Sequence, residues 1–430
     1  MWLYALLPCT LDPEIWPKLE MSISLELTSA AADARHTFFK LAFAIGVLVA
    51  GLEVGYLLHS PLPYDPVGYL VGRDFANTWV GAQLALTGDP QAYFAADSYN
   101  RLLAEKFGAG YPLHIWSYPP HLLLFTWPLA LMPYMAAYIL YCAVGLAVYL
   151  AVASGSERRL DYLALLAIAP AVIVNIWCGQ NGFFIAALLV GGLMVLDRRP
   201  ILAGLLFGML SIKPQLGILL PLMLALTGRW RTVLAAATTI LLLVTAASLV
   251  FGVSVWTAYI NDAMPVQSRV FLREFENFMT HMPTAFMNAR VAGLPLPAAA
   301  GLQIAVSLAA VGAVMWTFWR RRDADLSNAL LLTAAFLATP YAFNYDMVVF
   351  GPVITKLMDR AGNTALDYGL MLAVWALPFL TVALGIAGIP LSFLPLAALA
   401  ARLLWRLQQS EKTSATDQGE AGNAGVAVTP

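Results

Sequence analysis

Residues 231–251 read RTVLAAATTILLLVTAASLVF, a run with a single charged residue at its first position. About 20 mostly apolar residues in a helix are long enough to cross the hydrocarbon core of a bilayer. Shorter apolar helices can also cross where neighbouring helices shelter them. The sequence predicts about twelve such spans, with 119–131 too short to be counted. The runs are 38–58, 132–153, 160–176, 182–197, 200–212, 214–227, 231–251, 299–319, 326–340, 345–358, 367–385 and 388–405.

The composition supports the same class of protein. Of the 430 residues, 60% are apolar and only 11% are charged, whereas about 25% are charged in soluble domains. The net charge of −1 gives no argument for a nucleic-acid partner, which would require a basic stripe or patch. Cys9, Cys142 and Cys178 suggest neither a disulfide framework nor a metal cluster. The predicted fold class is an all-α polytopic membrane protein whose solvent is the lipid bilayer.

The distribution of Lys and Arg predicts the orientation, because these residues stay on the cytoplasmic side of short loops. With both termini cytoplasmic, 17 of the 24 basic residues lie inside. Two long segments, 59–118 and 252–298, then lie outside. We expect a cytoplasmic segment 1–36, with Met1 or Met21 as the start, a transmembrane domain 37–407 and a disordered tail 408–430. The basic residues left outside are Arg73, Arg101, Lys106, Lys213, Arg269, Arg273 and Arg290.

The first outer segment contains a candidate general base. Arg73 and Asp74 precede an apolar set near helical spacing that ends at Gly88-Asp89-Pro90, which predicts an interfacial helix. Asp74 at its start would suit a cap for free backbone N–H groups. It would equally suit a base that takes the proton of an acceptor hydroxyl in a glycosyl transfer with inversion. A phosphate leaving group departs without protonation, so no second carboxylate is required.

Lys213 is the leading candidate for binding such a phosphate. It lies between two apolar runs in Ser211–Gln215. A charged Lys at the bilayer centre costs about 2.5 to 3.5 kcal/mol, which favours a partner or ligand. Pro214 predicts a helix break at this point. The alternative is a Lys that snorkels to the head groups. Arg73 is a second candidate cation for the phosphate.

Further polar residues in predicted outer turns are candidates for binding a sugar. They can equally be ordinary turn residues, since Gly, Asn, Asp and Pro form turns for backbone reasons, and a structural role is also open for His121. The candidates are Tyr118, His121, Gln180, Asn181, Gln215, Asn344 and Asp346.

An ordered set of motifs covers most of the chain and resembles glycosyltransferase family 87. The resemblance implies a GT-C fold, an inverting mechanism, and transfer of a hexosyl group, such as mannosyl, from a polyprenyl-phosphate sugar. It also implies a glycolipid or polysaccharide acceptor, the plasma (inner) membrane, and no cofactor or obligatory metal. The motifs are Asp74-Phe75 with Trp79, Gly88-Asp89-Pro90, Tyr118-Pro119-Pro120, Gly179-Gln180-Asn181-Gly182, Ala203-Gly204 and Ile212-Lys213-Pro214.

The resemblance assigns the family's acidic residue to Asp74 and its Lys-Pro pair to Lys213-Pro214. The turn 340–346 departs from the family, because it lacks a histidine that some members carry there. Two other classes stay open. A secondary transporter would have a similar number of spans, although its halves should be repeated, and no such repeat is evident. A non-catalytic envelope polysaccharide assembly protein would keep the fold without transfer activity.

Overall fold

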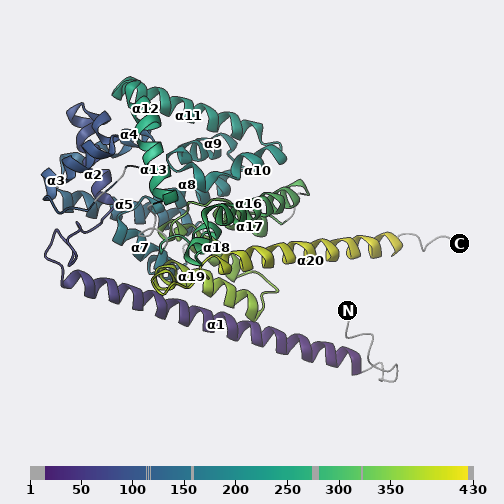
Figure 1. Ribbon diagram of the computed structural model, residues 1–430. Helices are drawn as coiled ribbons and strands as arrows, with labels where there is room; N and C mark the ends of the chain where they lie inside the picture. The colour runs from purple at the N-terminus through teal and green to yellow at the C-terminus, as the bar shows by residue number, and fades with distance from the viewer. Residues whose placement is uncertain are drawn as a thin grey trace.

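The computed structural model describes residues 15–424 except 113, 115, 117, 156–158, 274–279, 321 and 322. Within these residues every regular element is a helix, and an isolated bridge pairs Tyr64 with Leu70. Figure 1 shows the long helix α1 (Ile15–Leu58) along one side of a helical bundle. The start of α1 and the end of α20 (Leu394–Ala424) point toward the same end of the molecule.

Five helices are long and apolar enough to cross a membrane. A sixth span is formed if α6 (Leu160–Ala167) and α7 (Pro170–Cys178), bent by 46° at their junction, are taken together. This confirms a multi-pass, helical membrane protein, while the count of about twelve spans stays a prediction. The five are the Ala30–Leu58 part of α1, α5 (Tyr134–Ala153), α11 (Trp230–Phe251), α16 (Leu296–Trp319) and α19 (Ala365–Ile386).

Shorter helices fill the bundle between these spans. The most extensive helix pair is α9 with α11, and small residues allow its close approach. A Cβ at Gly204 would lie 2.5 Å from Cβ of Ala235, and one at Gly208 would lie 2.5 Å from Cβ of Thr239. Two glycines four residues apart let helices pack tightly in membranes. The shorter helices are α8 (Gly182–Val195), α9 (Pro200–Met209), α10 (Leu220–Leu226), α17 (Ala324–Ala338) and α18 (Phe350–Met358).

The first outer segment folds at one end of the bundle, where Figure 1 shows α2, α3 and α4 together. Its helix α2 (Phe75–Thr87) begins after Asp74 and ends at Gly88 in the left-handed conformation, with φ +82°, as the sequence predicts. The rings of Tyr93 and Tyr99 lie fully buried beside it. The other helices of this segment are η2 (Pro90–Tyr93) and α3 (Ala96–Phe107), and η3 (Pro120–Leu122), α4 (Leu123–Thr126) and η4 (Trp127–Leu131) follow it.

The second outer segment contacts the first. The ring of Phe94 lies 5.8 Å from that of Tyr259, and the Gln91 amide donates a hydrogen bond to Ser254 Oγ. The two segments that the charge rule places outside therefore meet at the same end of the molecule. The helices of the second segment are α12 (Ser254–Ala258), η7 (Tyr259–Ala263), α13 (Met264–Arg273) and α15 (Ala285–Val291).

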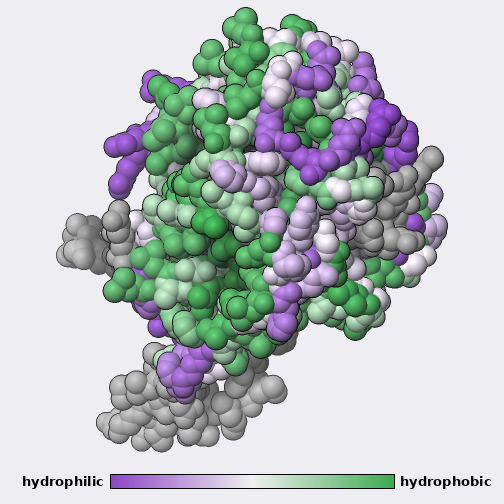
Figure 2. Space-filling model, turned by 90° about the vertical axis from the view of Figure 1, so that its left-hand side faces the viewer, coloured by the Kyte–Doolittle hydropathy of each residue, from purple (hydrophilic) through white to green (hydrophobic). Residues whose placement is uncertain are grey.

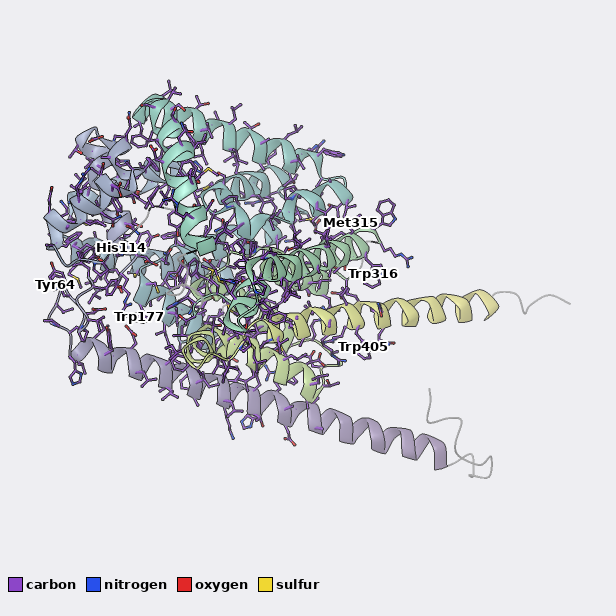
Figure 3. All side chains as sticks on the ribbon, viewed as in Figure 1. Tyr64, His114, Trp177, Met315, Trp316 and Trp405 are labelled. Atoms are coloured by element: carbon purple, nitrogen blue, oxygen red, sulfur yellow. The ribbon has the colours of Figure 1, made fainter. Side chains whose placement is uncertain are left out.

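The turns predicted to be cytoplasmic are joined by ion pairs. Arg35 lies 3.0 Å from Asp359, and Arg159 lies 3.2 Å from the same carboxylate. Arg360 pairs with Asp323 at 2.6 Å. Figure 3 shows Tyr64, His114 and Trp177 toward one end of the bundle, and Trp316 and Trp405 toward the other. Aromatic residues at both ends are typical of the two membrane interfaces.

The sequence predicts a disordered tail over 408–430, and this stays a prediction. The helix α20 extends to Ala424, and residues 425–430 lie outside the described part. The segment contains alanine, glutamate and glutamine, whose helix propensity is high, so the helix can continue without an apolar face. At the other end, residues 1–14 of the predicted segment 1–36 are not described, and α1 begins at Ile15.

We propose that the end formed by α2 and α3 faces the outside of the cell. Glu105→Cys should then react with a membrane-impermeant maleimide on intact cells, whereas Arg198→Cys should react only after permeabilisation. Both positions are exposed, and the native Cys142 and Cys178 are buried. A Cys9→Ser background removes the remaining thiol. Labelling with the opposite sidedness would contradict this orientation.

Candidate active site

The turn between α7 and α8 lies at the end of the bundle where α2 begins, which we call the polar end. Gly179 has a φ of +62°, and a Cβ there would lie 2.5 Å from Cβ of Phe75 and 2.7 Å from the carbonyl oxygen of Gly72. A Cβ at Gly182 would lie 2.7 Å from the carbonyl oxygen of Tyr345. The turn therefore fits between the start of α2 and η8 (Asn344–Val349) because these two positions lack side chains.

Asn175 holds this turn from within α7. Its amide nitrogen donates to the carbonyl of Gln180 at 3.1 Å, and its amide oxygen accepts from the N–H of Gly182 at 2.9 Å. The side chain is 1% exposed. Sequence reasoning missed Asn175, although a single amide inside an apolar helix is a signal, because buried polar groups need partners.

Asp74 is tied to this turn rather than to its own helix. Its side chain makes no capping hydrogen bond with α2, so the capping interpretation does not describe the structure. Instead its Oδ2 accepts from Gln180 Nε2 at 2.7 Å, and Gln180 Oε1 accepts from the Tyr118 hydroxyl at 2.6 Å. Asp74 is half-buried. Its carboxylate is thus oriented by a side chain from another element while part of it faces outward.

The Tyr118 hydroxyl sets the orientation of the Gln180 amide. Burial, together with the nearby carboxylates of Asp346 and Asp74, raises the pKa of Tyr118 well above its ordinary value. The hydroxyl therefore stays protonated and donates to Gln180 Oε1. Since an amide has its donor and acceptor on opposite sides of the fork, Nε2 must then face Asp74.

Lys213 is fully enclosed rather than snorkelling to the head groups. It lies between η5 (Leu210–Ile212) and η6 (Pro214–Gly217), and its side chain is 2% exposed. The ammonium lies 2.5 Å from Asp346 Oδ1 and 3.5 Å from Asn181 Oδ1. It also faces the ring of Tyr345 at 4.8 Å and that of Tyr118 at 5.8 Å. Tyr118 therefore contacts both the Asp74 side and the Lys213 side of the site.

The turn 340–346 supplies the counter-charge of Lys213. The Asp346 side chain is fully buried, and its Oδ2 accepts from the N–H of Phe343 at 3.2 Å. Asn344 supports the same turn, because its Nδ2 donates to the carbonyl of Pro378 at 2.8 Å and its Oδ1 accepts from the N–H of Tyr345 at 3.0 Å. The Asn344 amide is thus occupied by backbone, which makes it a structural group in this state.

His121 reaches the site through a neighbour of Lys213. Its Nε2 lies 3.0 Å from Ser211 Oγ, and its ring stacks on Trp256 with the centroids 5.9 Å apart. Burial lowers the pKa of His121 to about 4, so the ring is neutral at physiological pH. Its Nδ1 has no hydrogen-bond partner among the described residues. Gln215 is half-buried, and its side chain has no hydrogen bond within the same part of the chain.

Arg73 has a counter-charge of its own, Asp65. Its guanidinium is 2.9 Å from Asp65 Oδ2 and lies between the rings of Tyr69 and Trp177, 4.7 and 4.6 Å from their centroids. Its φ of +28° turns the chain sharply before Asp74. The sequence did not single out Asp65, whose carboxylate compensates this cation.

The fold and the site define a membrane-embedded protein whose buried polar groups converge at the loop end of a helical bundle. The sequence profile of glycosyltransferase family 87 matches residues 116–340. This is slightly more than half of the chain, and it includes Tyr118, Gln180 and Lys213. The chain belongs to glycosyltransferase family 87 and is a membrane glycosyltransferase, which confirms the resemblance. Neither a curated protein nor a solved structure matches the chain.

The described residues contain no group of three or more His, Cys, Asp or Glu side chains that could hold a metal ion. The titratable groups near the turn are instead arranged as pairs of an acid with a cation or an amide, namely Asp346 with Lys213 and Asp74 with Gln180. The charge of Asp346 is therefore balanced by Lys213, whereas Asp74 accepts a hydrogen bond from the neutral amide of Gln180.

The buried ion pair generates a prediction for stability. Lys213→Met or Asp346→Asn should each destabilise the protein by about 3–5 kcal/mol, because one charge is left buried without its partner. The double variant should lose much less than the sum of the two. The stabilities of the wild type, the two single variants and the double variant are compared by thermal unfolding of the detergent-solubilised proteins. Additive losses would show that the two side chains do not depend on one another.

Proposed function

We propose that the chain transfers a hexosyl group, with inversion, from a polyprenyl-phosphate sugar to a glycolipid or polysaccharide acceptor at the outer face of the plasma membrane. Mannose is the first sugar to test. One observation supports this proposal most directly. The half-buried carboxylate of Asp74 contacts Gln180, and the buried ammonium of Lys213 contacts Asn181, the next residue of the same turn. This arrangement supports the transfer of a sugar away from a phosphate.

Asp74 is proposed as the general base. The acceptor hydroxyl oxygen forms a bond to the anomeric carbon while the bond from that carbon to the phosphate oxygen breaks, and the hydroxyl proton passes to the Asp74 carboxylate. Of its two oxygens, Oδ2 accepts from Gln180, which leaves Oδ1 for the acceptor. A positioned base of this kind contributes about 10²- to 10⁴-fold to the rate.

Lys213 is proposed to bind the leaving phosphate. An ammonium has three N–H donors, and two of these face Asp346 and Asn181. The third is available to a phosphate oxygen, on which negative charge accumulates as the bond breaks. Asp346 holds the ammonium in place before the donor arrives. Arg73, whose Nε has no partner among the described residues, is proposed as a second cation for the same phosphate.

The sugar hydroxyls are proposed to contact polar groups around these two residues. Asn181, Gln215 and His121 Nδ1 retain hydrogen-bonding capacity, whereas the Asn344 amide is already occupied. Family membership supports transfer over secondary transport. A non-catalytic assembly protein would keep its function when Asp74 loses its charge, whereas a transferase would lose activity. Substitution of Asp74 therefore distinguishes the catalytic role from the assembly role.

The main test compares Asp74→Asn with Asp97→Asn in membranes supplied with radiolabelled polyprenyl-phosphate mannose and native lipid extract. Asp74→Asn should reduce transfer by about 10²- to 10⁴-fold, because the base is lost while the shape is kept. Asp97 lies in the same outer segment, exposed and without a side-chain hydrogen bond among the described residues, so its substitution should leave transfer unchanged. Both variants are checked for folding by size-exclusion chromatography.

Equal transfer by wild type and Asp74→Asn would remove Asp74 as the base. Transfer from another polyprenyl-phosphate hexose, but not from the mannosyl donor, would retain the mechanism and change the sugar. A folded wild type that transfers from none of these donors would contradict the proposed donor class.

Gln180 is proposed as a positioning residue. Gln180→Leu keeps the side-chain volume but removes the donor to Asp74 and the acceptor of Tyr118. It should lower kcat about ten- to a hundredfold, because a small misplacement of a catalytic group is enough for such a loss, while KM for the donor stays nearly constant. A rise in KM with unchanged kcat would instead place Gln180 in donor binding.

A further inference from the structure

A cavity of about 480 Å³ lies away from the candidate active site, along the part of α1 that the charge rule places toward the cytoplasm. Its lining residues from α1 recur every three or four positions between 32 and 44, so they form one face of the helix. Asp161 at the start of α6 closes the other side. The cavity is therefore a groove between α1 and α6 that follows the helix axis.

The groove changes character along its length. Arg35 and His36 come first along α1, Phe39 and Lys40 follow one turn later, and Phe43 lies almost a further turn on. From Arg35 to Phe43 the helix rises about 12 Å, which is comparable with the depth from the head groups into one leaflet. Phe43 is 44% exposed, so the apolar end opens toward lipid. The cations therefore extend as far as Lys40, beside Phe39, and the apolar lining continues beyond them to Phe43, which fits a molecule with an anionic head and a hydrocarbon chain.

The charge balance around the groove leaves a cation uncompensated. Arg35 pairs with Asp359 at 3.0 Å, and Arg159 bridges Asp359 and Asp161 at 3.2 and 2.6 Å. Two guanidinium groups thus match two carboxylates. Lys40 is exposed, and its ammonium has no ion pair or hydrogen bond among the described residues. This ammonium is the group that a phosphate in the groove would neutralise.

We propose that this groove binds an anionic phospholipid of the cytoplasmic leaflet, with its phosphate at Lys40 and His36 and an acyl chain against Phe39 and Phe43. The site is separate from the proposed sugar transfer and does not depend on it. A cation near the membrane surface attracts acidic lipids by an amount that corresponds to about a fivefold change in affinity. The neighbouring ion pairs keep Arg35 in position in the groove.

Native mass spectrometry of the detergent-purified full chain tests the proposal. Phosphatidylglycerol and phosphatidylcholine with the same acyl chains are titrated separately. The wild type should bind phosphatidylglycerol at least about fivefold more tightly, and Lys40→Gln should remove about a fivefold preference, whereas Lys40→Arg should retain it. Arg198→Gln is the matched control, because Arg198 is also exposed in a turn on the same side of the predicted topology.

The part of the groove proposed to bind the acyl chain of the lipid is tested separately. Phe43→Ser should weaken phosphatidylglycerol binding, and glycerol phosphate at the same concentration should not displace the lipid. Displacement by glycerol phosphate would indicate a free-phosphate site instead. Equal affinity for the two lipids, or an equal loss in Lys40→Gln and Arg198→Gln, would overturn the proposal. A folded His36→Gln variant provides a second measurement if Lys40→Gln is poorly expressed.

Discussion

The buried ion pair between Lys213 and Asp346 is the interaction on which the polar end of the bundle depends. It joins residues 133 positions apart, and both side chains are almost completely removed from water. Burial of either charge alone would be strongly unfavourable, so the turn after α9 and the turn after α17 must remain together. Asn181 and Tyr345 complete the surroundings of the ammonium. Consequently the turn of Gly179–Gly182 is held between these elements and the start of α2.

Composition and apolar runs were sufficient to predict a helical, multi-pass membrane protein, because the bilayer imposes a strong and local constraint on sequence. Lys213 could also be found, since a charge between two apolar runs is rare. The pairing of Lys213 with Asp346 could not be derived, because it depends on the tertiary arrangement of distant turns. The same holds for Asp74, whose partner Gln180 is 106 positions away. Local reasoning offered a helix cap for Asp74, but its tertiary partner accounts for its orientation.

The residues that sequence reasoning missed share one property: each holds or neutralises another part of the site. Asn175 braces the Gly179–Gly182 turn, and Asp65 compensates Arg73. Such side chains carry no motif of their own, because many polar residues can brace a turn or balance a charge.

The two halves of the candidate site differ in exposure in a way that suits two kinds of substrate. Asp74 belongs to the first outer segment and is half-buried. Lys213 lies between η5 and η6 and is 2% exposed, so in the proposed transfer the donor must bring its phosphate into the bundle. Tyr118 contacts both halves, donating to Gln180 and facing the Lys213 ammonium. In the proposed transfer, a sugar between Asp74 and Lys213 would lie beside the Tyr118 ring, with the acceptor on the Asp74 side and the leaving phosphate on the Lys213 side. Inversion requires the acceptor and the leaving group to lie on opposite sides of the anomeric carbon.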